Sequence, residues 1–223
     1  PTAIAAGTYT VGSSGTYTNL SEAVADLNHR GVSGAVTISL QRATEDTTSA
    51  NGSNIFPIIF APITGTSATN TITVQPASGT TTVQWMGTVG NNSVGNQYVY
   101  SSNTSATVIN AFNPTASNVP IMGVIGTDYL KINNLNLQYH YTPSTPSSGM
   151  IIRGLLVSNY SATDGATNNT FKGIGVTLNR AQTLTIGIEQ NVLAVAPSAA
   201  GGANSTNKYQ DFTIKNAYSG ILL

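Results

Sequence analysis

The sequence predicts an all-β domain built as a solenoid of stacked coils, with one α-helix near its N-terminus. Three observations predict it: short β-branched runs separated by turn residues, an apolar pattern that repeats in the second half, and a single segment with helical periodicity. The length of 223 residues suits one elongated domain, so we expect a single domain over residues 1–223. Because the final stretch YSGILL is an apolar run, we expect this domain to be the N-terminal part of a longer protein.

The helix is predicted over residues 19–30, within the stretch TNLSEAVADLNHRG. Asn19 suits the N-cap, and Glu22 follows it three residues later, as in a capping box. A stack of strands leaves unpaired backbone at its ends, so we expect the helix to cap the first coil strand, AVTISL. An ordinary surface helix on a β-sandwich is the alternative. The apolar stripe of the helix contains Leu20, Ala23, Val24 and Leu27.

The strands are predicted from the runs AVTISL, NTITVQP, TTVQW and ATVIN, which taken alone also fit a sandwich or a jelly roll. The second half favours a solenoid, because segments from Lys131, Thr170 and Lys208 carry one apolar pattern that recurs after 39 and then 38 residues. One turn of a three-faced coil with a protruding loop accounts for each period. Three columns of stacked side chains are expected inside the stack. The first contains Ile132, Phe171 and Tyr209, the second Leu135, Ile174 and Phe212, and the third Leu137, Val176 and Ile214.

One polar position recurs within this repeat. Asn134, Gly173 and Asp211 each lie between the first and second apolar residues of their segment. Residues of this kind favour a tight turn with left-handed backbone, and stacked side-chain amides would add a ladder of hydrogen bonds there.

With these segments in view, the chain resembles a known family. The phrases GTYTVGSSGTYTNLSEAVADLNHRGVSGAVTISL, NTITVQPASGTTTV, DYLKINNLNL, NNTFKGIGVTL and NKYQDFTIKNAYSGILL are similar to successive coils of pectin-lyase-like domains in large secreted and cell-surface proteins of Gram-negative bacteria. Such proteins typically leave the cell by type IX secretion. The resemblance implies a right-handed parallel β-helix with an N-terminal capping α-helix, and a secreted or cell-surface location. It implies little about activity, because the same fold serves lyases, hydrolases, adhesins and stalks.

Composition excludes several classes of function. Only 7% of residues are charged, 8 basic and 8 acidic, and the basic residues are scattered singly along the chain, so we expect no nucleic-acid partner. No apolar run approaches the roughly 20 residues of a membrane span, so we expect no membrane insertion. The chain has no cysteine, its two histidines are far apart, and it lacks a calcium-loop motif, so we expect no metal and no cofactor.

The sequence predicts no catalytic residue. Glycoside hydrolysis needs two carboxylates about 5 to 9.5 Å apart. Three aspartates fall at different places relative to the repeat: Asp128, Asp164 and Asp211. A lyase would need a cationic base, for which Arg153 and Lys172 are the best candidates, although a lone cation on a solvated face is the simpler interpretation.

Aromatic residues provide the predicted ligand site. Alternation along strands puts each tyrosine pair on one face, where sugar rings stack, although the same pairs also suit cross-strand packing. We therefore expect a non-enzymatic module for adhesion, glycan binding or scaffolding, whose partner is a polysaccharide or another surface or secretion-system protein. The alternative is a polysaccharide lyase or glycoside hydrolase whose active groove is incomplete in this fragment. The predicted ligand-binding residues are Trp85, Tyr98, Tyr100, Tyr139 and Tyr141.

Overall fold

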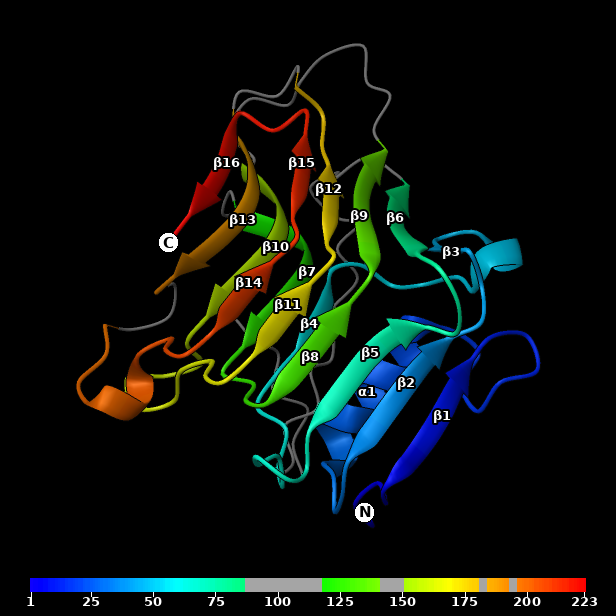
Figure 1. Cartoon of the computed structure of the whole chain (residues 1–223), viewed down its shortest axis with the longest axis horizontal. Coiled ribbons are helices and arrows are strands. Elements are labelled where there is room, and N and C mark those ends of the chain that lie inside the picture. Colours follow the sequence, from blue (N-terminus) through cyan, green and yellow to red (C-terminus); the bar gives the residue numbers. More distant parts are fainter. Residues whose placement is uncertain (87–117, 141–150, 181–183, 193–195) are drawn as a thin grey trace.

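The computed structural model describes five parts of the chain, and all structural statements below concern these parts: residues 1–86, 118–140, 151–180, 184–192 and 196–223. They contain the α-helix α1 (Leu20–Arg30) and two single-turn 3-10 helices, η1 (Ser49–Asn51) and η3 (Ala200–Gly202). The remaining elements are strands, which form three sheets (Figure 1). The strand predicted at residues 106–110 lies outside the described residues.

Each sheet gathers strands that lie far apart in the sequence. Sheet 1 contains, in spatial order, β1 (Gly7–Val11), β2 (Val36–Leu40), β5 (Ile72–Pro76), β8 (Leu130–Asn133), β11 (Thr170–Lys172) and β14 (Lys208–Gln210). Sheet 2 contains β3 (Thr44–Asp46), β6 (Thr81–Met86), β9 (Leu135–His140), β12 (Gly175–Thr177) and β15 (Thr213–Lys215). Sheet 3 contains β4 (Ile58–Phe60), β7 (Asn118–Ile125), β10 (Ile151–Ser158), β13 (Thr185–Asn191) and β16 (Ser219–Leu222).

The order of the strands is compatible with a parallel β-helix. From β2 onward, consecutive strands enter sheets 1, 2 and 3 in rotation, so that each passage through the three sheets forms one coil. All pairs between these strands are parallel, and their side chains enclose a continuous apolar core. Figure 1 shows the two termini at opposite ends of this stack.

The strand register confirms the predicted apolar columns. In the first column, Phe171 aligns with Ile132 of β8 on one side and with Tyr209 of β14 on the other. The third column follows the same register, and beside the second column the N–H of Thr213 donates to the carbonyl of Ile174 at 3.1 Å. The columns are buried except in the last coil, where their members are half-buried. The phenol of Tyr209 donates a hydrogen bond of 2.9 Å to Oε1 of Gln190, which provides a polar partner for this half-buried tyrosine.

The predicted left-handed turns are confirmed as well. Asn134, Gly173 and Asp211 have φ values of 54°, 65° and 56°. Gly173 has a second constraint, because a Cβ there would lie 2.4 Å from Oδ1 of Asn134 in the coil before. These turns join sheet 1 to sheet 2 in the last three coils, between β8 and β9, between β11 and β12, and between β14 and β15.

A ladder of side-chain amides, buried at Asn169 and half-buried at Asn207, lies at a different corner from the predicted one, between sheets 3 and 1. Oδ1 of Asn169 accepts from the N–H of Leu130 at 2.8 Å, and its Nδ2 donates to the carbonyl of Thr127 at 2.8 Å. Asn207 makes the same two bonds one coil later, with Asn169 and Ala166. Each side chain therefore satisfies backbone groups of the preceding coil where the strand ladder is interrupted.

Helix α1 forms where the sequence predicts it. The side chain of Asn19 accepts from the N–H of Glu22 at 2.8 Å, and the carboxylate of Glu22 accepts from the N–H of Thr18 at 2.8 Å. At the other end, Gly31 adopts φ 67° and its N–H donates to the carbonyl of Leu27. Local capping chemistry therefore contributes to both ends of the helix, and two distant side chains add to it: Glu45 and Asn54 accept from the N–H groups of Leu20 and Ser21.

The position of the helix corrects one expectation. The first strand of sheet 1 is β1, which precedes the helix and pairs with β2, so the AVTISL strand is not at the end of its sheet. Helix α1, drawn behind β2 and β5 in Figure 1, instead covers the edge of sheet 3. Asn28 makes this contact: its Nδ2 donates to the carbonyl of Ile59 at 2.8 Å, and its Oδ1 accepts from the N–H of Ala61 at 3.0 Å. One side chain thus replaces the neighbouring strand that β4 lacks.

Candidate functional site

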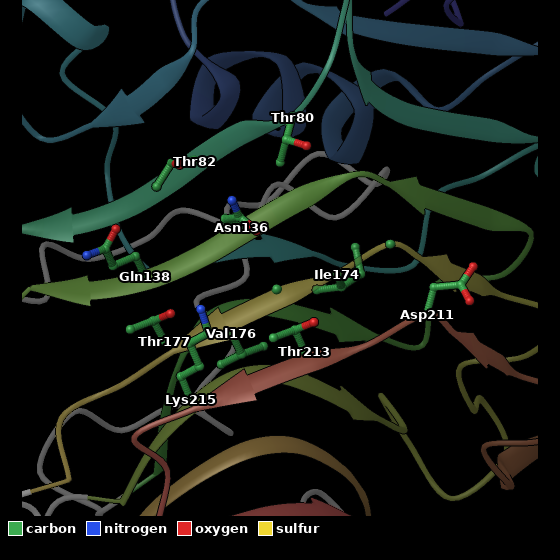
Figure 2. A pocket seen from close by; sticks show the side chains of 12 residues that line it. Thr80, Thr82, Asn136, Gln138, Ile174, Val176, Thr177, Asp211, Thr213 and Lys215 are labelled. Atoms are coloured by element: carbon green, nitrogen blue, oxygen red, sulfur yellow. The ribbon is translucent and has the colours of Figure 1, made fainter.

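A groove of about 320 Å³ lies on the outward face of sheet 2 (Figure 2). The register places Thr82, Asn136, Gly175 and Thr213 side by side on four consecutive strands, in one outward column that crosses the groove. Gln138, Thr177 and Lys215 form a second column two residues further along. Because strand residues alternate, the apolar residues between these positions point into the core and leave a polar wall outside.

Glycine opens the centre of the groove. A Cβ at Gly175 would lie 2.2 Å from Oδ1 of Asn136, well inside van der Waals contact. The missing side chain therefore allows the Asn136 amide to extend over the neighbouring strand. The sequence predicted a turn at Gly173, but nothing in it distinguished Gly175 from an ordinary strand residue.

The chemistry of the groove suits hydrogen bonding to a hydroxyl-rich ligand. Threonine hydroxyls and the amides of Asn136 and Gln138 provide both donors and acceptors. Figure 2 shows Asp211 at one end of the groove and Lys215 towards the other. Asp211 is the one carboxylate among the lining residues, and a single carboxylate cannot serve as the acid and base pair that glycoside hydrolysis uses.

Two of the aspartates discounted in the sequence lie in the segments that lead into strands of sheet 1, Asp128 before β8 and Asp164 before β11. Burial, and then the negative charge of Asp128, raise the pKa of Asp164 to about 6. Asp128 accepts two hydrogen bonds of 2.7 Å at Oδ1, from the N–H and the hydroxyl of Thr167. The repeat spacing pairs Asp128 with Thr167, and Asp164, three residues before Thr167 in the chain, ends a tight turn that begins at Tyr160. A carboxyl group with a raised pKa is the kind of group that transfers protons.

Arg153 is not the solvated cation that the sequence suggested. Only 3% of this side chain is exposed, and its guanidinium forms an ion pair with Glu189, which is 5% exposed. Glu189 also accepts from Nδ2 of Asn191 at 2.9 Å. Within the described residues, Nη1 of Arg153 has no hydrogen-bond partner. Lys172, by contrast, is exposed at the end of β11, as expected.

The predicted aromatic platform is only partly within the described residues. Trp85 and Tyr139 are aligned on β6 and β9 and are 6% and 4% exposed. The indole stacks on Phe56 with centroids 5.8 Å apart, and it meets the Tyr139 ring edge to face at 5.8 Å. These rings therefore pack in the core. Tyr98, Tyr100 and Tyr141 lie outside the described residues, so a glycan platform built on this set stays a prediction.

In the described ranges, no group of three or more His, Asp and Glu side chains is placed to hold a metal ion. No helix in the same part of the chain is both long and apolar enough to cross a membrane. Comparison of the chain with known protein families, curated proteins and solved structures finds no match. The resemblance to pectin-lyase-like domains and to proteins of type IX secretion therefore stays a prediction.

Proposed function

We propose that the protein is a non-enzymatic, secreted or cell-surface module with a right-handed parallel β-helix fold, which binds glycans as an adhesive or scaffold. The observation that carries the proposal is the groove on sheet 2, whose outward hydroxyl and amide groups suit a neutral sugar chain. Its volume is at the lower end of ligand sites, which are typically about 300 to 1,000 Å³. A groove of this size holds a short stretch of a longer glycan, as an adhesive module requires.

The composition of the chain supports an extracellular location. Threonine, asparagine, serine and glycine replace the charged residues that cover ordinary soluble proteins, and only 7% of residues are charged. A neutral polar surface retains its hydrogen-bonding capacity across wide changes in ionic strength, because screening acts on charges.

The proposal is tested with neutral polysaccharides. Binding of hydroxyethyl cellulose, dextran and starch is measured by affinity electrophoresis for the wild type and for Asn136→Ala/Gln138→Ala. The matched control is Gln41→Ala/Gln75→Ala, which removes two side-chain amides from the part of sheet 1 around β2 and β5. We expect at least tenfold weaker binding from the groove variant alone, since each lost hydrogen bond contributes about 0.5 to 1.5 kcal/mol. Equal binding by all three proteins would refute the assignment to the groove.

A second candidate function, glycoside hydrolysis, is favoured by the Asp128–Asp164 pair. In the same samples, release of reducing ends from neutral and acidic glycans measures turnover. If the wild type hydrolyses a glycan and Asp164→Asn does not, the protein is a glycoside hydrolase and the proposal of a non-enzymatic binding module is wrong.

A further inference from the structure

All four lysines of the chain lie on the outward faces of its last three coils. Lys215 is on sheet 2, and the other three are on sheet 1: Lys131 in β8, Lys172 in β11 and Lys208 in β14. All four are exposed. In the sequence these residues are isolated, and only the parallel stacking of strands brings them together.

The register defines the arrangement on sheet 1. Thr170 aligns with Lys131 on one side and with Lys208 on the other, so the two ammonium groups flank a threonine hydroxyl. Two residues further along the strands, Lys172 aligns with Asn133 and Gln210. We name this six-residue surface the lysine face: Lys131, Asn133, Thr170, Lys172, Lys208 and Gln210.

The lysine face lacks compensating charge. Strands β8, β11 and β14 contain no acidic residue. The ion pairs within the described residues all involve arginine, not lysine. Asp128 and Asp211 are the acids closest in sequence, and they lie in turns at the two ends of the strands. In a chain with so few charges, three like charges on three adjacent strands repel one another, and an anionic ligand would relieve that repulsion.

We propose that the lysine face binds an extended anionic polysaccharide that lies across the strands, along the axis of the stack. This inference rests on the proposed glycan-binding function and names its ligand class. Strands are spaced about 4.8 Å apart, which is close to the length of one sugar unit in an extended glycan. Acidic groups on alternate sugars would thus meet Lys131 and Lys208, while Thr170, Asn133 and Gln210 bond sugar hydroxyls.

The chemistry of the face favours a polysaccharide over a nucleic acid. Proteins that bind single strands stack bases on aromatic side chains, and arginine is the preferred partner of phosphate because its donors match two oxygens at once. The outward positions of the lysine face contain neither aromatic residues nor arginine.

Carboxymethyl cellulose and hydroxyethyl cellulose provide matched probes, since they share a backbone and differ in charge. Their dissociation constants are measured by affinity electrophoresis for the wild type, for Lys131→Gln/Lys208→Gln and for the control Arg30→Gln/Arg180→Gln. The control removes two cations that lie outside both the lysine face and the groove, and it changes the net charge equally. We expect roughly tenfold weaker binding of carboxymethyl cellulose by the first variant, and a change within about twofold for the control. Wild-type binding should also weaken as salt rises, because exposed ion pairs are screened.

Three results would overturn the proposal. The first is an equal loss of affinity for carboxymethyl cellulose in both variants, and the second is wild-type binding of carboxymethyl cellulose that does not depend on salt. The third is that single-stranded DNA binds as tightly as carboxymethyl cellulose and loses the same affinity in Lys131→Gln/Lys208→Gln. The proposed groove is judged separately, by hydroxyethyl cellulose and Asn136→Ala/Gln138→Ala. If Lys131→Gln/Lys208→Gln still binds hydroxyethyl cellulose, the proposed role of the groove stands even when the proposal for the lysine face is refuted.

Discussion

Replacement of Asn28 by alanine tests whether the helix takes the place of a strand. Asn28 is 2% exposed, and its amide makes two hydrogen bonds to the backbone beside Ile59 and Ala61. Alanine keeps the helix, because its helix propensity is higher than that of asparagine, but it removes both bonds. The variant therefore leaves one buried carbonyl and one buried N–H of the sheet 3 edge without partners.

The magnitude follows from those two groups. A buried backbone group left unsatisfied costs about 1 to 3 kcal/mol, so we expect Asn28→Ala to lower the free energy of unfolding by about 2 to 6 kcal/mol. That is a large part of the roughly 5 to 15 kcal/mol by which domains are stable.

Urea unfolding followed by circular dichroism measures this loss, and hydrogen exchange reports on the Ala61 amide, which should lose protection. Asn136→Ala is the matched control, since it truncates an exposed asparagine on sheet 2. Equal stability of the two variants would refute the idea that Asn28 replaces a strand neighbour, and the helix would then be an ordinary surface element.

Two further predictions concern the core and the carboxylate pair. Ile174→Ala should lower the free energy of unfolding by about 2 to 5 kcal/mol, as measured by urea unfolding. The Ile174 side chain is 1% exposed, and the cavity that its removal leaves cannot close unless the neighbouring side chains of the column move. For Asp164, the folded-state pKa of about 6 lies above the ordinary 3.8, so the folded protein binds the proton more tightly and loses that stability as the pH rises from about 4 to 6. Asp164→Asn should thus melt at a higher temperature than the wild type at pH 7.5 and lose this difference near pH 4; the same difference at both pH values would contradict the raised pKa.

The parts of the fold that depend on near neighbours in the chain were predictable. Helix α1 was predictable from Asn19, Glu22 and Gly31, whose capping bonds are local, although Glu45 and Asn54 also accept the N–H groups of Leu20 and Ser21 in its first turn. The turns at Gly173 and its counterparts follow from residue types that tolerate left-handed backbone. Strand β1 was not predicted, because GTYTV shows only a weak alternation of apolar and polar residues. Its backbone is held as a strand by parallel pairing with β2, which the local sequence does not reveal.

The surroundings of individual side chains were not predictable in the same way. Arg153 was expected to be solvated, yet it lies buried against Glu189 on the adjacent strand β13. Asp128 and Asp164 fall at different places in the repeat, and the influence of the Asp128 charge on the pKa of Asp164 depends on a tight turn from Tyr160 to Asp164 that the repeat does not predict. Trp85 contacts Phe56, a residue whose position depends on the path of the chain between β3 and β4.

The sequence by itself determined the strand period, the apolar columns and the single helix, because each reflects free energies that act within a few residues or recur at each coil. Only the tertiary structure decided which outward side chains became neighbours. Strand stacking brings residues some 40 positions apart to within about 4.8 Å, and the register that aligns them is set by the inward apolar column. Packing of the inward side chains therefore fixes which outward side chains form the groove on sheet 2 and the lysine face on sheet 1. No local pattern in the chain reveals either surface.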